Sequence, residues 1–315
     1  HAHLHEGALI ASVLARPWGI PVVFDYQGSL TDELLQHRFI KPNSAACALF
    51  RRVEHIANRV PHAVLTSTRH AADALRAELG GRVPVEALPD GVNPHTFRPD
   101  VASAQQRIQL RARWGIEPDE PVVVFLGLLA RHQGIGNLIE AATILKAESR
   151  RVRWLVMGYP GVEEWHQVAS AAGVLPEIVF TGRVAYADAP LMLALGDVAV
   201  APKLSLTEGS GKILNYMAMA LPTVAFDTPV AREYLGAWGV YAERGNAESL
   251  AEKLLSVLAD RERQEHLGGQ LRQRAAELYD WNHAAHQIVD VYMEALGGYR
   301  RSATSSPQIR SVDQR

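Results

Sequence analysis

The sequence has little cysteine, little net charge and no long apolar run, three features that would each indicate a particular class of protein. It contains a single cysteine, Cys47, so an internal disulfide is impossible and nothing indicates an oxidising compartment. Its formal net charge is only −2, which gives no electrostatic reason to expect a nucleic-acid partner. The longest nearly apolar stretch, residues 213–226, is too short to cross a membrane. We therefore expect a cytoplasmic globular protein that neither spans a membrane nor binds nucleic acid.

Three catalytic motifs are missing as well. Without an Asp-x-Asp motif, a nucleotide diphosphate would be neutralised by protein cations and helix ends, not by a carboxylate-bound Mg²⁺. We therefore predict no metal and no cofactor. The absence of a Gly-x-Ser-x-Gly elbow and of a P-loop removes the central residues of hydrolases and NTPases.

What is present from residue 120 onward is a regular alternation of short β-branched runs and amphipathic segments. This pattern is typical of a parallel sheet with helices on both faces. Five or six strands of this kind are visible: PVVVFLG, VRWLVMG, EIVFTG, DVAVAP, LPTVAFD and GVYAE. We predict that residues 120–280 form one complete, doubly wound, Rossmann-like α/β domain.

The first hundred residues show the same pattern with fewer repeats: IPVVFD, HAVLTS and VPVEALP. Three parallel strands would leave an unprotected sheet edge, so we predict that residues 1–99 are the second half of an incomplete Rossmann-like domain whose earlier strands precede His1. Residues 100–119 are predicted to be an interdomain linker, and residues 281–296 a helix that crosses back to the first domain. The polar, Arg-rich residues 297–315 are predicted to be disordered, with weak contact to an anionic membrane surface as the alternative.

Ligands of open parallel sheets bind beyond the carboxyl ends of the strands, so the loops there are the candidate sites. In GLLARHQGIGN, Gly127 and Gly134 allow close backbone approach and the following helix start favours a phosphate. We predict a diphosphate site in this loop; an ordinary tight turn is the alternative. Arg183 and Val184 are predicted to form a shelf for a flat base, with a solvated loop as the alternative.

A second loop joins a carboxylate, a Gly-Ser-Gly turn and a lysine before an apolar helix. Glu208 is predicted to accept hydrogen bonds from sugar hydroxyls, and Lys212 to add a full positive charge. Three residues between them expose amides that suit phosphate oxygens: Gly209, Ser210 and Gly211.

The chain start invites a metal interpretation, because alternate residues of a strand point the same way. The residues concerned are His1, His3, His5 and Glu6. No acidic or Cys/His cluster with ligand spacing follows, so we predict no metal site here.

In this order, the motifs resemble those of the family 4 glycosyltransferases of the GT-B fold. HAHLHEGALIA looks like the family's His-rich strand end, PVVFDYQGS like its next strand, and LPDGVNPHTFRP like the entry to its linker. GLLARHQGI looks like its diphosphate loop and EGSGKILNYMAMALPTVAF like its donor-sugar loop and helix. The resemblance runs from His1 to about Leu296.

The chain departs from the family pattern at charged positions. The family often has Arg and Lys in the diphosphate loop where this chain has Leu128 and Gln133, and Asn215 stands in place of the family's second Glu. Gln27 occupies a position often held by His. The nearest replacements for the lost positive charge are Arg131, Lys203 and Lys212.

The resemblance implies a metal-independent, retaining transfer of a hexose from a UDP- or GDP-linked donor to a glycan, lipid or small molecule. Glu208 and Lys212 would be catalytic, and His3, Glu6 and Gln27 would lie on the acceptor side. The alternatives are a non-catalytic nucleotide-sugar-binding protein and an epimerase on the same fold. Because the first domain looks incomplete, we expect these 315 residues alone to turn over little or nothing.

Overall fold

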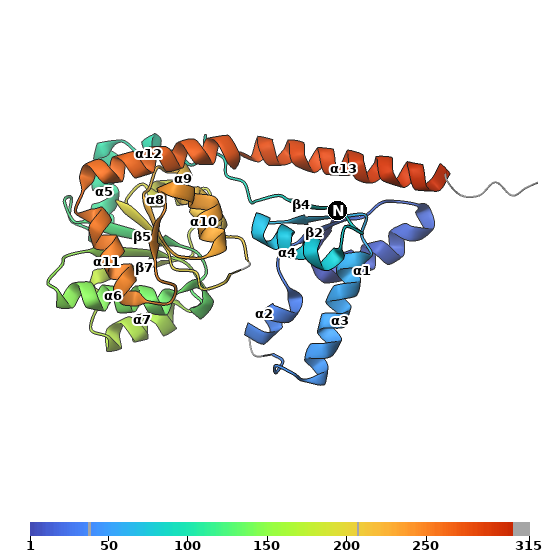
Figure 1. Cartoon of the computed structure of the whole chain (residues 1–315). Coiled ribbons are helices and arrows are strands. Elements are labelled where there is room, and N and C mark those ends of the chain that lie inside the picture. Colours follow the sequence, from blue (N-terminus) through green and yellow to red (C-terminus); the bar gives the residue numbers. More distant parts are fainter. Residues whose placement is uncertain (37–38, 207, 305–315) are drawn as a thin grey trace, which may run out of the picture. The chain divides into compact units, whose positions relative to one another are not determined.

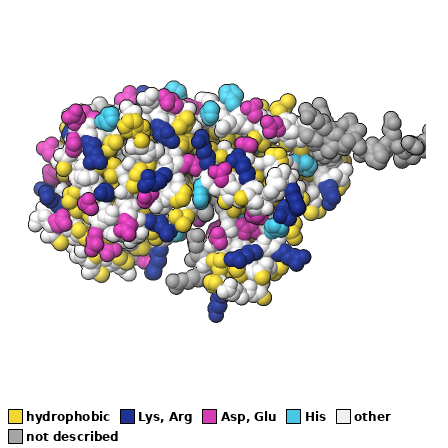
Figure 2. All heavy atoms as spheres, viewed as in Figure 1, with side chains coloured by type: hydrophobic (Ala, Val, Ile, Leu, Met, Phe, Trp, Pro, Cys, Tyr) yellow, Lys and Arg dark blue, Asp and Glu magenta, His cyan; other side chains and the backbone are white. Residues whose placement is uncertain are grey.

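The computed structural model describes residues 1–36, 39–206 and 208–304 (Figure 1). The chain divides into two compact units: the first combines His1–Pro89 with the chain from Ala284 onward, and the second is Asp90–His283. Among the described residues, no helix is long and apolar enough to cross a membrane. Charged side chains of both signs are interspersed over the face shown in Figure 2.

The second unit is built on a six-stranded parallel sheet in the order β10-β9-β8-β5-β6-β7. This confirms the predicted doubly wound α/β architecture. The strands are β5 (Val122–Leu126), β6 (Arg153–Met157), β7 (Ile178–Gly182), β8 (Val198–Ala201), β9 (Thr223–Phe226) and β10 (Val240–Ala242). The helices are α5 (Ala104–Arg113), α6 (Ile135–Ala147), α7 (Val162–Ala171), α8 (Ala189–Leu193), α9 (Gly211–Ala218), α10 (Pro229–Leu235), α11 (Ala247–Leu258) and α12 (Arg261–Leu278).

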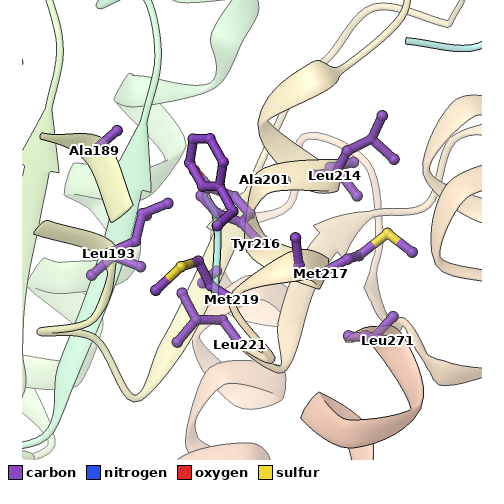
Figure 3. Close-up of a cluster of buried hydrophobic side chains, with 14 of the residues drawn as sticks. Ala189, Leu193, Ala201, Leu214, Tyr216, Met217, Met219, Leu221 and Leu271 are labelled. Carbon is purple, nitrogen blue, oxygen red and sulfur yellow. The ribbon is translucent and has the colours of Figure 1, made fainter. Parts of the chain in front are cut away.

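Strand β5 shows why both faces of this sheet are apolar. Val123 and Phe125 pack with residues of α6, α7 and α11 on one face. Val122 and Val124 belong to the cluster on the other face, with residues of α8, α9, α10 and α12. Figure 3 shows part of this second cluster, in which α8, α9 and α12 contribute Leu193, Met217 and Leu271. The unbroken apolar runs in the sequence therefore reflect burial on two sides.

A hydrogen bond joins helix α9 to the end of the central strand, β5. The hydroxyl of Tyr216 accepts a hydrogen bond from the backbone amide of Leu126 at 2.7 Å, and the Tyr216 side chain is fully buried. Because Leu126 is the last residue of β5, this contact places α9 beside the carboxyl end of that strand. That edge carries the candidate site.

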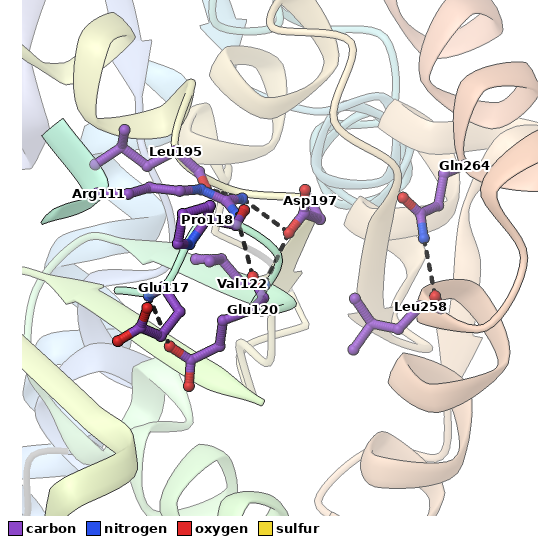
Figure 4. Close-up of polar contacts among 9 residues, drawn as sticks. All are labelled: Arg111, Glu117, Pro118, Glu120, Val122, Leu195, Asp197, Leu258 and Gln264. Atoms are coloured by element: carbon purple, nitrogen blue, oxygen red, sulfur yellow. Dashed lines mark hydrogen bonds and ion pairs between the residues drawn. The ribbon is translucent and has the colours of Figure 1, made fainter. Parts of the chain in front are cut away.

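The predicted linker, residues 100–119, is part of the second unit. Phe97, Ala102 and Ile116 are buried in its core. On α5, the buried Arg111 donates hydrogen bonds to the carbonyls of Leu195, Pro118 and Glu120 and to the Asp197 carboxylate (Figure 4). The unit boundary accordingly falls after Pro89 and not at residue 99, and the turn signals around residue 90 mark it.

The first unit has a four-stranded parallel sheet in the order β1-β2-β3-β4, one strand more than the sequence predicted. The strands are β1 (Ala2–His3), β2 (Val23–Tyr26), β3 (Ala63–Thr66) and β4 (Val85–Ala87), and the helices are α1 (Leu4–Ala15), α2 (Leu30–Gln36), α3 (Ala45–Arg59) and α4 (Arg69–Leu79). Strand β1 is only two residues long, so it carries no periodicity that a sequence pattern could reveal. Five short 3-10 helices complete the chain: η1 (Arg16–Trp18), η2 (Pro99–Val101), η3 (Arg131–Gln133), η4 (Leu175–Glu177) and η5 (Gly236–Trp238).

The last helix, α13 (Trp281–Thr304), covers one face of the first sheet. Val291 and Ala295 pack there against Val23 and Leu65. The opposite face of this sheet packs on α1 and α4. The helix continues past residue 296, its predicted end, to Thr304. The remainder of the predicted tail lies outside the described residues.

Candidate functional site

The two glycines of the predicted diphosphate loop are required by neighbouring protein atoms. Gly127 follows β5 with a φ of 153°, and a Cβ there would lie 2.5 Å from the Nζ atom of Lys212. Gly134 has a φ of 81°, and a Cβ there would lie 1.9 Å from the carbonyl oxygen of Pro202. The loop therefore packs closely on α9 and on the end of β8. These contacts bring two predicted site segments that are distant in the sequence onto one edge of the sheet.

Lys212 is the cation at the centre of this edge. Its ammonium donates a hydrogen bond to Oε1 of the buried Gln133 at 2.7 Å and lies 4.2 Å from the ring centroid of Phe125. Burial, with a smaller contribution from the charge of Lys203, lowers the pKa of Lys212 to about 7. Among the described residues, no carboxylate oxygen lies within 4.0 Å of its Nζ atom. The lysine is therefore held in place without a counter-charge.

Glu208 is paired with a different lysine. The Nζ atom of Lys203 lies 2.8 Å from a carboxylate oxygen of Glu208 and donates to the carbonyl of Gly209 at 2.7 Å. The backbone amide of Glu208 donates to the hydroxyl of Ser205. Lys203 therefore fixes the Glu208 loop, whereas Lys212 has no carboxylate partner in the described part of the chain.

The first turn of α9 begins without a side-chain cap. Ser210 occupies the N-cap position but makes no capping hydrogen bond, and its buried hydroxyl has no partner among the described residues. Gly211 follows it, and a Cβ there would lie 3.3 Å from a carboxylate oxygen of Asp90. Sequence reasoning missed Asp90, although it assigned the surrounding LPDGV motif to the domain boundary.

The remaining predicted donor residues lie in three different settings. Arg183 and Val184 line a pocket of about 520 Å³ whose wall includes Trp114, and the guanidinium of Arg183 lies 5.2 Å from the ring centroid of Tyr159. Arg131 is 89% exposed and faces Glu164 of α7 at 3.8 Å, so no contact joins it to Lys203 or Lys212. Asn215 is half-buried on α9.

In the first unit, two of the three predicted acceptor residues meet at one carboxylate. Nδ1 of His3 lies 2.7 Å from a carboxylate oxygen of Asp25, and Nε2 of Gln27 donates to the other oxygen at 2.6 Å. Asp25 was not predicted, since nothing in PVVFDYQGS distinguishes it from a strand-end residue. Glu6 is exposed on α1, and no contact brings it to Asp25.

The chain start does not form the extended strand on which the sequence interpretation relied. Helix α1 begins at Leu4, so His5 is buried in the helix near Glu54, with its Nε2 atom 3.8 Å from a carboxylate oxygen. His1 and His3 instead lie together with Asp25. The carboxylate beside these histidines comes from a second strand, 22 residues after His3, where no ligand spacing in the sequence indicated it.

Two family models match this chain. Residues 106–274 match the model described as Glycosyl transferases group 1, which covers more than half of the chain. The chain belongs to the group 1 glycosyl transferases. Residues 1–91 match the Glycosyl transferase 4-like domain. The family that the five motifs indicated is thereby confirmed.

This group 1 glycosyl transferase is 26% identical over 303 residues to alpha-D-kanosaminyltransferase of Streptomyces kanamyceticus, covering 93% of the chain and 76% of that protein. It is 29% identical over 225 residues to the GDP-mannose-dependent alpha-(1-6)-phosphatidylinositol monomannoside mannosyltransferase of Mycobacterium tuberculosis strain CDC 1551 / Oshkosh, covering 67% of the chain and 56% of the mannosyltransferase. Among solved structures it is similar to Anabaena Alr3699/HepE, determined in complex with UDP. The TM-score is 0.78 at 17% identity, covering 93% of this chain and 79% of that one. These likenesses confirm the GT-B fold.

Proposed function

We propose that the protein transfers a hexose from a UDP- or GDP-linked donor to an acceptor hydroxyl, with retention of anomeric configuration and without a metal at the diphosphate. The observation that carries this proposal is the Lys212 ammonium, which lies beside Gly127 and Gln133 and has no carboxylate partner among the described residues. GDP-mannose, named for the mannosyltransferase relative, and UDP, bound in the solved neighbour, motivate the choice of nucleotides.

The diphosphate is proposed to lie between Lys212, the Gly127–Gly134 loop and the start of α9. A helix start offers free amides and a partial positive charge to an anion. The uncapped Ser210 keeps such amides free of side-chain competition. The lysine supplies the full charge that the family's Arg and Lys would supply at positions 128 and 133. Fixed cations of this kind stabilise the charge that develops on a leaving phosphate.

The other donor groups are assigned by proximity to this edge. The base is proposed to occupy the pocket beside Arg183 and Val184, and the sugar to lie against Glu208 and Asn215. When the donor is bound, the sugar hydroxyls would donate hydrogen bonds to the Glu208 carboxylate and so replace part of its interaction with Lys203. On the first unit, His3 and Gln27 are proposed to bind the acceptor.

The chemical step breaks the bond between the anomeric carbon and the diphosphate oxygen and forms a bond from that carbon to the acceptor oxygen on the same face. The acceptor proton passes to the departing phosphate oxygen, which becomes the leaving nucleoside diphosphate. Lys212 and the α9 amides stabilise the negative charge on that group. No redox partner is needed.

The decisive experiment is calorimetric titration of the full chain with UDP, GDP and ADP at pH 6 and pH 8, with and without Mg²⁺. We expect one of these nucleotides to bind without Mg²⁺, and Lys212→Met to weaken its binding roughly tenfold at pH 6, because a charge-assisted hydrogen bond is lost. The pKa of Lys212 is lowered from 10.5 to about 7, so the ammonium is charged at pH 6 and largely neutral at pH 8. The affinity of the unsubstituted protein should therefore fall as the pH rises through 7.

Lys253→Met on α11 is the matched control, because it removes the same charge from a lysine that pairs with Glu252 on the surface. The nucleotide's own phosphate titrates in the same way with the unsubstituted protein and with both variants. A pH dependence of the affinity that is lost only in Lys212→Met is therefore due to Lys212. Equal affinities in the two lysine variants would refute the assignment. Binding of none of the three nucleotides would instead favour a degenerate, non-catalytic relative.

A further inference from the structure

A separate cluster in the first unit has the composition of a metal centre. Its members are His1, His3 and Asp25: His3 ends β1 and pairs with Asp25 near the carboxyl end of β2, and His1 immediately precedes β1. Each offers one ligand atom, and these atoms lie within 4.8 Å of one another. Imidazole and carboxylate are the ligand types that zinc and related divalent ions prefer.

The separations between these atoms suit a tetrahedral ion. Metal–ligand bonds of 2.0–2.2 Å at a tetrahedral angle place two ligand atoms roughly 3.3 Å apart. The distance from Nδ1 of His3 to Oδ2 of Asp25 is 2.7 Å, and that from Nε2 of His1 to the same oxygen is 3.9 Å. These two distances lie on either side of the required one, and the third, between the ligand nitrogens of His1 and His3, is at most 4.8 Å, so modest side-chain movements would bring the ligands into place.

Hydrogen bonds from neighbouring side chains orient two of the three ligands, His1 and Asp25, through the atoms that are not directed at the proposed metal position. Nδ1 of His1 lies 2.6 Å from the hydroxyl of Tyr292 on α13, which leaves Nε2 directed at Asp25. The Nε2 atom of Gln27 donates to Oδ1 of Asp25 at 2.6 Å, which leaves Oδ2 for the centre. Outer hydrogen bonds of this kind orient metal ligands and are found around most metal-bound histidines and carboxylates.

We propose that His1, His3 and Asp25 bind one divalent transition-metal ion of the zinc class. The three protein ligands leave a fourth position for an oxygen ligand, either water or a substrate hydroxyl. Sheets of this type bind ligands at this edge. The proposal concerns the first unit alone and does not depend on how the donor diphosphate is neutralised.

A second histidine–carboxylate pair provides an internal comparison. Nδ1 of His55 lies 3.0 Å from a carboxylate oxygen of Glu78, in a similar pairing, and both side chains are exposed. Among the described residues, no third His, Cys or carboxylate ligand joins this pair. Two ligands bind such ions far more weakly than three, so this pair should show only background affinity.

The test is competition titration of the full chain with Zn²⁺ against a chromophoric chelator at pH 7.5, with Co²⁺ absorption as a second readout. We expect one Zn²⁺ per chain and an affinity at least tenfold lower in His1→Gln and in Asp25→Asn. His55→Gln should leave the affinity unchanged. Co²⁺ should give the intense visible absorption of a four-coordinate ion, and the two ligand variants should lose it.

Equal Zn²⁺ affinity in His1→Gln and His55→Gln would overturn the proposal, because it would show diffuse binding to surface histidines. Binding weaker than the chelator can detect in the unsubstituted chain would overturn it as well. Circular dichroism of each apo variant verifies folding. His1→Gln keeps the experiment decisive if Asp25→Asn fails to fold, since His1 contributes no buried side chain to the core.

Discussion

Gly127 sets the position of the Lys212 side chain. A Cβ at residue 127 would lie 2.5 Å from the Lys212 Nζ atom, and the lysine end is the flexible partner, so Lys212 would move and not the strand. We expect Gly127→Ala to weaken nucleotide binding about tenfold while costing about 1 kcal/mol of stability through its unfavourable φ. Calorimetry with the nucleotide that binds, together with urea unfolding, measures the two effects.

Gly115→Ala is the control for backbone strain. Gly115 also has a positive φ, of 64°, but a Cβ there meets no atom within 4 Å. It should lower stability by a similar amount and leave nucleotide affinity unchanged. If both variants lost affinity equally, general destabilisation would explain the result, and Gly127 would have no specific part in positioning Lys212.

At the scale of single residues, local motifs indicated the candidate site, but the sequence did not predict contacts between residues that are far apart along the chain. Glu208 and Lys212 stood out because a carboxylate, a Gly-Ser-Gly turn and a lysine precede an apolar helix. The Lys212–Gln133 hydrogen bond joins residues 79 positions apart, and no motif reports such a contact. Asp25 was missed for the same reason, because its partner His3 lies on another strand, 22 residues earlier.

At the scale of elements, α5 depends on one buried arginine. Arg111 donates to three backbone carbonyls and to Asp197, which also accepts from the amide of Val122 on β5. Arg111→Ala would leave those carbonyls without this donor and the half-buried carboxylate without its cation, which typically costs about 3 kcal/mol. Urea unfolding of the second unit measures the loss. Arg113→Ala, two residues further along the same helix but exposed, should change stability by less than about 0.5 kcal/mol.

The composition of residues 100–119, which include α5, explains why they were predicted to be a linker. Residues 100–119 are polar and bounded by turn signals, and their apolar residues are too few to show a helical stripe. Their attachment comes from Arg111 and from scattered core residues such as Ile116. Long apolar strands such as β5 were predictable because burial on two faces leaves a continuous apolar run. The two-residue β1 shows no periodicity; only the family resemblance of HAHLHEGALIA indicated a strand end there, and pairing with β2 identifies it in the structure.

For the molecule as a whole, α13 returns the end of the chain to the first unit. Its apolar residues face two ways: Val291 is 7% exposed and packs on Val23 and Leu65, whereas Val289 is 54% exposed. The helix was predicted from its periodicity, but only the structure shows which valine is buried.

Substitution of Val291 and of Val289 tests whether the two units unfold independently. Val291→Asp places an unpaired charge against the first sheet and should destabilise the first unit by roughly 3 kcal/mol. In hydrogen exchange, peptides from β2 and β3 should lose protection while peptides from β5 and β8 keep it, because those strands belong to the other unit. Val289→Asp should leave both sets unchanged. Loss of protection in β5 and β8 as well would show that the second unit unfolds with the first, and the nucleotide that binds near Lys212 should then protect β2 and β3 too.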